Sequence, residues 1–151
     1  MAFGAGVAMG KADWVRGMMA VALPALLAGC SATPQALEDS SNATSQSYTA
    51  SYLDVYQRVA GTAKRCLTSP GARLGAVDLG SIEVQSELHR ERGFGDVRFA
   101  VIGSFSANYF VAAKVEKSGN GSRVSVKVNN PLIGERLANM VFRWAGGDQS
   151  C

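Results

Sequence analysis

The sequence has 151 residues, of which 47% are hydrophobic and 18% are charged, and it carries a net charge of +3 at pH 7. This length suffices for one domain of ordinary size and is too short for two separate hydrophobic cores. The charges are interspersed along the chain rather than clustered, which argues against nucleic acid as a partner.

The first segment has the pattern of a secretory signal peptide. Two basic residues, Lys11 and Arg16, precede an apolar run from Met18 to Ala28 that contains Pro24. A membrane-spanning helix needs about 20 apolar residues, and this run has roughly half that number, so it predicts the core of a signal peptide and not a spanning anchor. Three methionines remain candidate start residues: Met1, Met9 and Met18.

The segment Leu27-Ala28-Gly29-Cys30 resembles the lipobox of bacterial lipoprotein precursors. This resemblance implies that the signal peptide, residues 1–29, is cut between Gly29 and Cys30. It also implies that Cys30 carries a covalent diacylglyceryl group and an N-linked acyl chain such as palmitate, which together hold a protein durably on a membrane. Ser31 in place of Asp after the cysteine implies sorting to the outer membrane of a Gram-negative cell. The alternative is a buried cysteine in an ordinary apolar helix, and the polar residues after Cys30 argue against it.

Residues 31–47 are rich in Ser, Thr, Ala and Gln and show no hydrophobic periodicity. Such a composition predicts a flexible tether with a mean reach of about 20–25 Å. We therefore expect residues 30–48 to contain the lipidated cysteine and the tether, and residues 49–151 to form a single domain close to the membrane surface.

Two cysteines, Cys66 and Cys151, remain once Cys30 is assigned to lipid. An even pair in an oxidising compartment predicts a disulfide, which in the chain-entropy model contributes roughly 4–5 kcal/mol for a loop of this length. Two alternatives stay open: a pair of free thiols, and a catalytic thiol at Cys66. A redox-active pair usually has the short Cys-x-x-Cys spacing, which this pair lacks.

The domain begins with a helical pattern over residues 49–67. Ser51 and Asp54 resemble a weak capping box at its start, and Ser69-Pro70-Gly71 predicts its end. Apolar side chains recur at intervals of three and four residues, as on one face of a helix: Tyr52, Tyr56, Val59, Ala63 and Cys66.

Alternating apolar and polar residues then predict four strands, at 82–88, 97–101, 109–115 and 124–128. Short connections between them indicate an antiparallel meander, and the glycine-rich turn 117–123 is the strongest hairpin signal. Asn130 and Pro131 predict the start of a helix over residues 132–145. Its expected core side is formed by Ile133, Leu137, Met140, Val141 and Trp144.

The expected fold is therefore α+β, in the order α-β-β-β-β-α, with both helices packed on one face of a four-stranded sheet. The lipobox, the polar segment, the helix YLDVYQRVAGTAKRC and the terminal RWAGGDQSC together resemble small lipoproteins of Gram-negative proteobacteria. Only the lipobox is a specific motif among these features. The resemblance implies an outer-membrane location facing the periplasm and no established activity.

Candidate chemistry is sparse in the sequence. His89, the single histidine, lies in a run of charged residues and is interpreted as part of a solvated turn, because a metal site needs three or four convergent ligands. Glu83 and Glu87 are more simply the solvated face of a strand than an acid–base pair. We therefore expect no enzyme, no metal and no cofactor apart from the lipid at Cys30.

Aromatic side chains near the third predicted strand form a possible recognition patch, composed of Phe105, Tyr109 and Phe110. Strict alternation would instead place Tyr109 in the core and Phe110 on the other face. The first functional hypothesis is a non-catalytic lipoprotein that binds an envelope protein. The alternatives are a module that binds a small ligand or lipid between sheet and helices, and a hydrolase inhibitor that presents the loop 103–108.

Overall fold

The computed structural model describes residues 33–39, 43–68, 73–74, 77–78, 80–103 and 106–151. Three of the predicted site residues lie outside these ranges: Gly29, Cys30 and Phe105. The cleavage and lipidation expected at the lipobox therefore stay predictions from the sequence.

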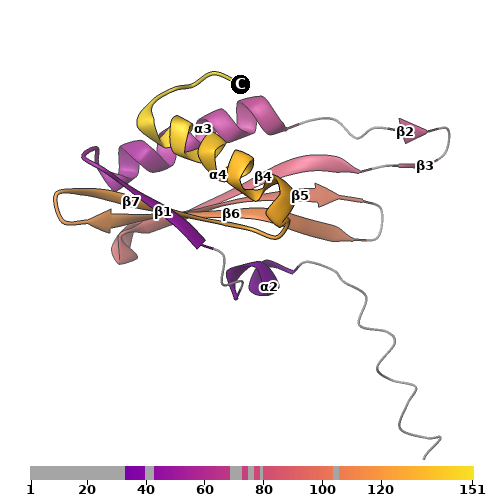
Figure 1. Ribbon diagram of the computed structural model, residues 1–151, viewed down its shortest axis with the longest axis horizontal. Coiled ribbons are helices and arrows are strands. Elements are labelled where there is room, and N and C mark those ends of the chain that lie inside the picture. The colour runs from indigo at the N-terminus through magenta and orange to yellow at the C-terminus, as the bar shows by residue number, and fades with distance from the viewer. Residues whose placement is uncertain (1–32, 40–42, 69–72, 75–76, 79, 104–105) are drawn as a thin grey trace, which may run out of the picture. The chain divides into compact units, whose positions relative to one another are not determined.

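Five antiparallel strands form the sheet at the centre of the fold, in the order β1-β7-β6-β5-β4 (Figure 1). They are β1 (Ala43–Tyr48), β4 (Ser81–His89), β5 (Phe94–Ile102), β6 (Ala107–Ser118) and β7 (Gly121–Val128). A separate two-stranded sheet is formed by β2 (Arg73–Leu74) and β3 (Val77–Asp78). The α+β class and the antiparallel order from β4 to β7 are confirmed, whereas the expected number of four strands is wrong.

The additional strand, β1, lies within the segment 31–47 for which composition predicts a flexible tether. It pairs with β7 along its whole length, from Ala43 opposite Lys127 to Tyr48 opposite Ser122. Main-chain hydrogen bonds hold an edge strand of this kind whatever its side chains are. Because most of its side chains are exposed, β1 has no alternating apolar pattern, and the tether prediction is wrong for these residues.

Two long helices, α3 (Tyr52–Leu67) and α4 (Pro131–Gly146), cover one face of the sheet, as the sequence predicts (Figure 1). We call this the closed face and the opposite one the open face. Each helix begins at a capping side chain: Ser51 accepts a hydrogen bond from the amide of Asp54, and Asn130 accepts one from the amide of Leu132.

The hydrophobic core lies between the closed face and the two helices. Phe99 and Trp144 are its largest fully buried side chains, and their ring centroids lie 6.4 Å apart in an edge-on arrangement. The ring of Tyr56 packs directly on Gly95, where a β-carbon would stand only 2.4 Å from it. Fully buried valines from β5, β6 and β7 complete the sheet side of the core: Val97, Val111, Val115, Val124 and Val126.

A β-bulge in β6 changes which side chains face the helices. Phe99 lies opposite Val111 and Ala100 lies opposite Tyr109, so Phe110 is the extra residue of the bulge. Phe110 packs against the core, with its ring centroid 6.1 Å from that of Phe99. The expectation from strict alternation, with Tyr109 in the core and Phe110 outside it, is therefore reversed.

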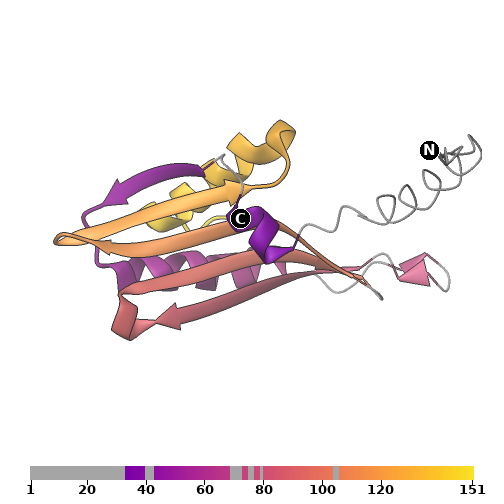
Figure 2. The same cartoon turned by 90° about the horizontal axis from the view of Figure 1, so that it is seen from below.

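A third helix, α2 (Pro34–Glu38), lies on the open face (Figure 2). Its Leu37 side chain is 1% exposed, and Glu38 forms an ion pair with Arg98 at 2.8 Å. The tether prediction is thus wrong here as well. One apolar side chain in a helix of five residues is too little to produce a periodic signal.

The sheet has two distinct ends. At the distal end, the 3-10 turn η2 (Arg90–Arg92) joins β4 to β5, and the turn at Gly119 joins β6 to β7. At the proximal end, β1 begins at Ala43 opposite Lys127, and α4 starts just after β7. The α2 helix contacts this proximal region, because the Lys127 ammonium donates to the main-chain oxygen of Glu38.

Candidate functional site

A groove of about 460 Å³ crosses the open face between α2 and the distal turn η2. Its residues come from β4, β5, β6, β7, η2 and α2. The charged side chains that line it, His89 apart, are Arg92, Arg98, Lys114, Lys127, Glu38 and Asp96. Four cations against two carboxylates make the groove net positive.

Strand register places these side chains together. Phe94, Asp96 and Arg98 alternate with the buried Val97 and Phe99 along β5, so they point to the open face. The next strands supply partners at the same level, because Asp96 pairs with Lys114 in the ladder and Arg98 pairs with Ala112.

A small side chain, that of Ala112, lies at the centre of the groove. Ala112 of β6 lies between Arg98 on one neighbouring strand and Lys127 on the other. Its methyl group leaves space below two long cationic side chains. The hollow thus follows from one small residue in a row of large ones.

The Phe94 ring is surrounded by basic groups. The guanidinium carbon of Arg92 lies 4.9 Å from the ring centroid and the Lys114 ammonium nitrogen lies 4.6 Å from it. Cations at this distance from an aromatic face are attracted by its electron density. The imidazole of His89 packs on the same ring, with 4.5 Å between centroids.

His89 is the last residue of β4, and its side chain is only 17% exposed. The prediction of a solvated turn is therefore wrong, because the ring is enclosed by Phe94 and two carboxylates. Its Nε2 lies 3.6 Å from Glu87 and 3.5 Å from Asp96. The Arg92 guanidinium lies 2.8 Å from Nδ1 and can only donate, which assigns the imidazole hydrogen to Nε2, facing the carboxylates.

Asp96 is the most enclosed carboxylate of the groove. Burial raises the pKa of its carboxyl above the ordinary value, while electrostatic interactions with Arg98, His89 and Lys114 lower that pKa in part. The negative charge of Glu38 raises it further. The neighbouring groups therefore stabilise the ionised Asp96 carboxylate by less than its burial destabilises it.

The two carboxylates weighed as an alternative acid–base pair, Glu83 and Glu87, lie in separate environments. Glu87 faces His89, while Glu83 lies further along β4, opposite Ala100. Cys66 is bonded to Cys151, so the alternative of a free catalytic thiol is excluded. Within the described ranges, no cluster of three or more His, Cys, Asp or Glu side chains is arranged to hold a metal ion.

The structure does not bring the predicted aromatic patch together. Tyr109 lies on the open face, where its hydroxyl donates to Gln85 Oε1 at 3.0 Å. Phe110 packs against the core on the closed face. The loop between β5 and β6 is closed by a hydrogen bond of 2.8 Å from the Gly103 amide to the carbonyl of Ser106.

The sequence-based candidates include His89 but not the other groove residues around it, among them Phe94, Asp96, Arg98 and Lys114. A signal for the first three was present in the segment FGDVRFAVI, where the residues between the buried positions are large and charged. The position of Lys114 depends on the register between β5 and β6, which no short pattern specifies.

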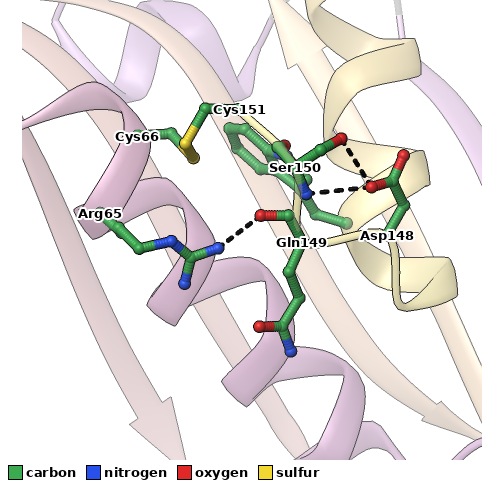
Figure 3. Close-up of a disulfide and its surroundings, with 7 residues drawn as sticks. Arg65, Cys66, Asp148, Gln149, Ser150 and Cys151 are labelled. Carbon is green, nitrogen blue, oxygen red and sulfur yellow. Dashed lines mark hydrogen bonds between the residues drawn. A yellow bond between two sulfur atoms is a disulfide. The ribbon is translucent and has the colours of Figure 1, made fainter.

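The predicted disulfide joins the end of α3 to the C-terminal tail (Figure 3). The Cα atoms of Cys66 and Cys151 lie 5.3 Å apart. The tail is also held by a hydrogen bond from Trp144 Nε1 to the carbonyl of Ser150 at 3.0 Å and by one from Arg65 to the carbonyl of Gln149 at 2.5 Å. These bonds fix both helices on the closed face.

None of the helices in the described part of the chain is both long and apolar enough to cross a bilayer. Comparison with models of known protein families gave no match to this chain, and a search of curated proteins gave none either.

Proposed function

We propose that the protein is a non-catalytic, lipid-anchored lipoprotein of the outer membrane that faces the periplasm and binds an envelope protein through the open-face groove. The anchor rests on the lipobox sequence at Cys30. The binding role rests on one observation, the arrangement of Arg92 and Lys114 around the Phe94 ring in a preformed groove.

This arrangement has the composition of a binding centre. Aromatic and arginine side chains dominate the energetics of protein interfaces when they sit in well-packed pockets. Here Phe94 is held by a ladder of main-chain bonds, so little ordering entropy is lost on binding. The excess of cations indicates that the partner supplies acidic side chains.

Internal pairing of the ionisable groups supports binding over catalysis. Arg98 pairs with Glu38 at 2.8 Å, Lys114 pairs with Glu116 at 2.6 Å, and His89 faces two carboxylates. A general base must reach a substrate proton at hydrogen-bond distance. In this groove the side chains instead hold one another in place and present a fixed charge pattern.

In-cell photo-crosslinking tests the proposal. A photoreactive amino acid replaces Ser125, which lines the groove, and the control carries the same group at the exposed Lys64 of α3. We expect a discrete adduct with one envelope protein from position 125 only. Identical adducts from both positions would overturn a groove-specific interaction.

Charge reversal provides the matched control within the groove. Lys114→Glu should weaken the adduct formed at position 125 by about tenfold, as expected for loss of a charged contact of about 1.4 kcal/mol. Lys64→Glu changes the net charge equally on the closed-face side and should leave the adduct unchanged. Equal effects of the two variants would indicate general electrostatic attraction in place of a site.

A small anionic ligand is the second candidate, because the groove volume of about 460 Å³ lies within the range of small-molecule pockets. Such a ligand would raise the melting temperature of the purified domain in proportion to the logarithm of its concentration. A screen of dicarboxylates and phosphate esters by thermal shift, with Lys114→Glu as the control, separates this candidate from a protein partner.

A further inference from the structure

We propose that Leu132 and Ile133, at the start of α4, form a second contact with the membrane and thereby orient the anchored domain with the distal turn η2, and the end of the groove beside it, away from the bilayer. This inference rests on the lipid anchor in the proposed function. Its occupant is the hydrocarbon edge of the bilayer that would hold the lipids on Cys30.

The two side chains are exposed in a way that the rest of the fold does not explain. Leu132 is 92% exposed and Ile133 is 46% exposed, and both belong to the first turn of α4. Ile133 was expected on the core side of the helix, so that expectation is wrong. These adjacent aliphatic side chains expose apolar surface to water, and burial against an apolar partner would remove that surface from water.

The first turn of α4 lies at the proximal end of the sheet. β7 ends at Val128 and α4 begins three residues later, at Pro131. A β-carbon built on Gly134 would lie 3.6 Å from that of Val128. Leu132 and Ile133 therefore belong to the turn of α4 that lies where β7 ends.

The apolar surface continues along α4. Ile133, Leu137 and Met140 are spaced four and three residues apart, which places them on one stripe of the helix. They line a groove in which Leu137 and Met140 are half-buried against the core. The groove also contains Glu135, Arg143 and the exposed Arg136, one turn after Leu132. An arginine above an apolar pair matches the boundary between lipid phosphates and acyl chains.

The length of chain before α2 places the anchor at the same end of the domain. Only three residue steps separate Cys30 from Thr33, the N-cap of α2, and a fully extended chain covers at most about 11 Å in three steps. α2 is in turn held at the proximal end, because Lys127 donates to the main-chain oxygen of Glu38.

Figures 1 and 2 show α2 and the start of α4 toward the same end of the sheet in both views, on opposite faces. A bilayer that holds lipids at Cys30 is then close to the end from which Leu132 projects. The second contact is intramolecular once the lipids are inserted, so even two side chains add substantially to the fraction of molecules in one orientation.

Depth-dependent quenching tests this orientation on the full lipidated protein. The native tryptophans are Trp14, in the segment expected to be removed, and Trp144, which is fully buried. Leu132→Trp and, as a control at the distal end, Asn120→Trp are each reconstituted in vesicles of phosphatidylethanolamine and phosphatidylglycerol that contain brominated acyl chains.

We expect brominated lipid to quench the fluorescence of Leu132→Trp at least twofold, relative to the same variant in vesicles without bromine, and to leave the fluorescence of Asn120→Trp unchanged in the same comparison. Equal quenching at both positions, or none at position 132, would overturn the inferred membrane contact. In that case, flotation of the protein with the vesicles would still support the lipid anchor. Failure of the processed wild-type protein to float would overturn the lipid anchor, and the membrane contact with it.

Discussion

The two faces of the sheet use the same strands for different purposes. On the closed face, Val97 and Phe99 of β5 are fully buried and carry no charge. On the open face, Asp96 and Arg98 alternate with them along the same strand and line a charged groove. Because alternation sends successive side chains to opposite faces, the buried core and the proposed binding groove are separated by a single residue step along the strand. Substitutions at adjacent positions should therefore have unrelated effects.

The largest difference is expected between Phe99 and Arg98. Phe99→Ala removes a ring that is 0% exposed and leaves a cavity, which should lower the free energy of unfolding by about 3–5 kcal/mol. Arg98→Ala, one step along β5, loses a half-exposed ion pair with Glu38 and should cost less than about 1 kcal/mol. Urea unfolding of both variants measures the contrast, and equal losses would show that the two faces are energetically coupled.

Removal of the disulfide should have the second largest effect. Replacing both Cys66 and Cys151 by Ser releases the loop constraint on the unfolded chain and should cost about 2–4 kcal/mol. Reductant should destabilise the wild-type protein by a similar amount and leave the double variant unchanged. Because the bond lies on the closed-face side, crosslinking from the open-face groove at Ser125 should persist at temperatures where the variant remains folded.

Leu37→Ala tests whether α2 is part of the folded domain. The Leu37 side chain is 1% exposed on the open face, and its truncation should lower the free energy of unfolding by about 2 kcal/mol. The loss is limited to this value because α2 can detach from the sheet as a unit. Leu132→Ala, at a side chain that is 92% exposed, is the matched control and should change stability very little. The same small loss in both variants would restore the tether interpretation of this segment.

The closed face was predictable because its signals are local. Tyr56 and Val59 recur at helical spacing in α3, and the valines of β6 and β7 alternate with polar residues, so helices, strands and core follow from periodicity. The open face was not predictable in this way. β1 has no apolar pattern, and no turn residue marks the bulge at Phe110 that places Tyr109 on the open face. The sequence predicted a solvated His89 because only the pairing of β4 with β5 brings the carboxylate of Asp96 next to it.

The same comparison predicts opposite pH effects at two carboxylates. Burial raises the pKa of Asp96 on the open face above its ordinary value of 3.8, whereas hydrogen bonds from Ser150 lower the pKa of Asp148 in the C-terminal tail. A raised native pKa means that the folded state favours the protonated acid, so the contribution of Asp96 is present below pH 3.8 and is lost as the pH rises through the raised value. A lowered native pKa reverses the sign for Asp148, whose contribution is present above pH 3.8 and is lost as the pH falls.

Asp96→Asn should therefore produce the smallest but most specific effect. The amide is neutral at every pH, so it removes the cost of holding a charge in the groove, a cost that Arg98, His89 and Lys114 offset only in part. We expect the melting temperature of the variant to exceed that of wild type at pH 7 and the difference to shrink as the pH approaches 4. Asp148→Asn, with the same change of side chain, should lower the melting temperature at pH 7 and converge with wild type in acid. A fall in stability of Asp96→Asn at pH 7 would show that the surrounding cations stabilise the carboxylate more than burial disfavours it.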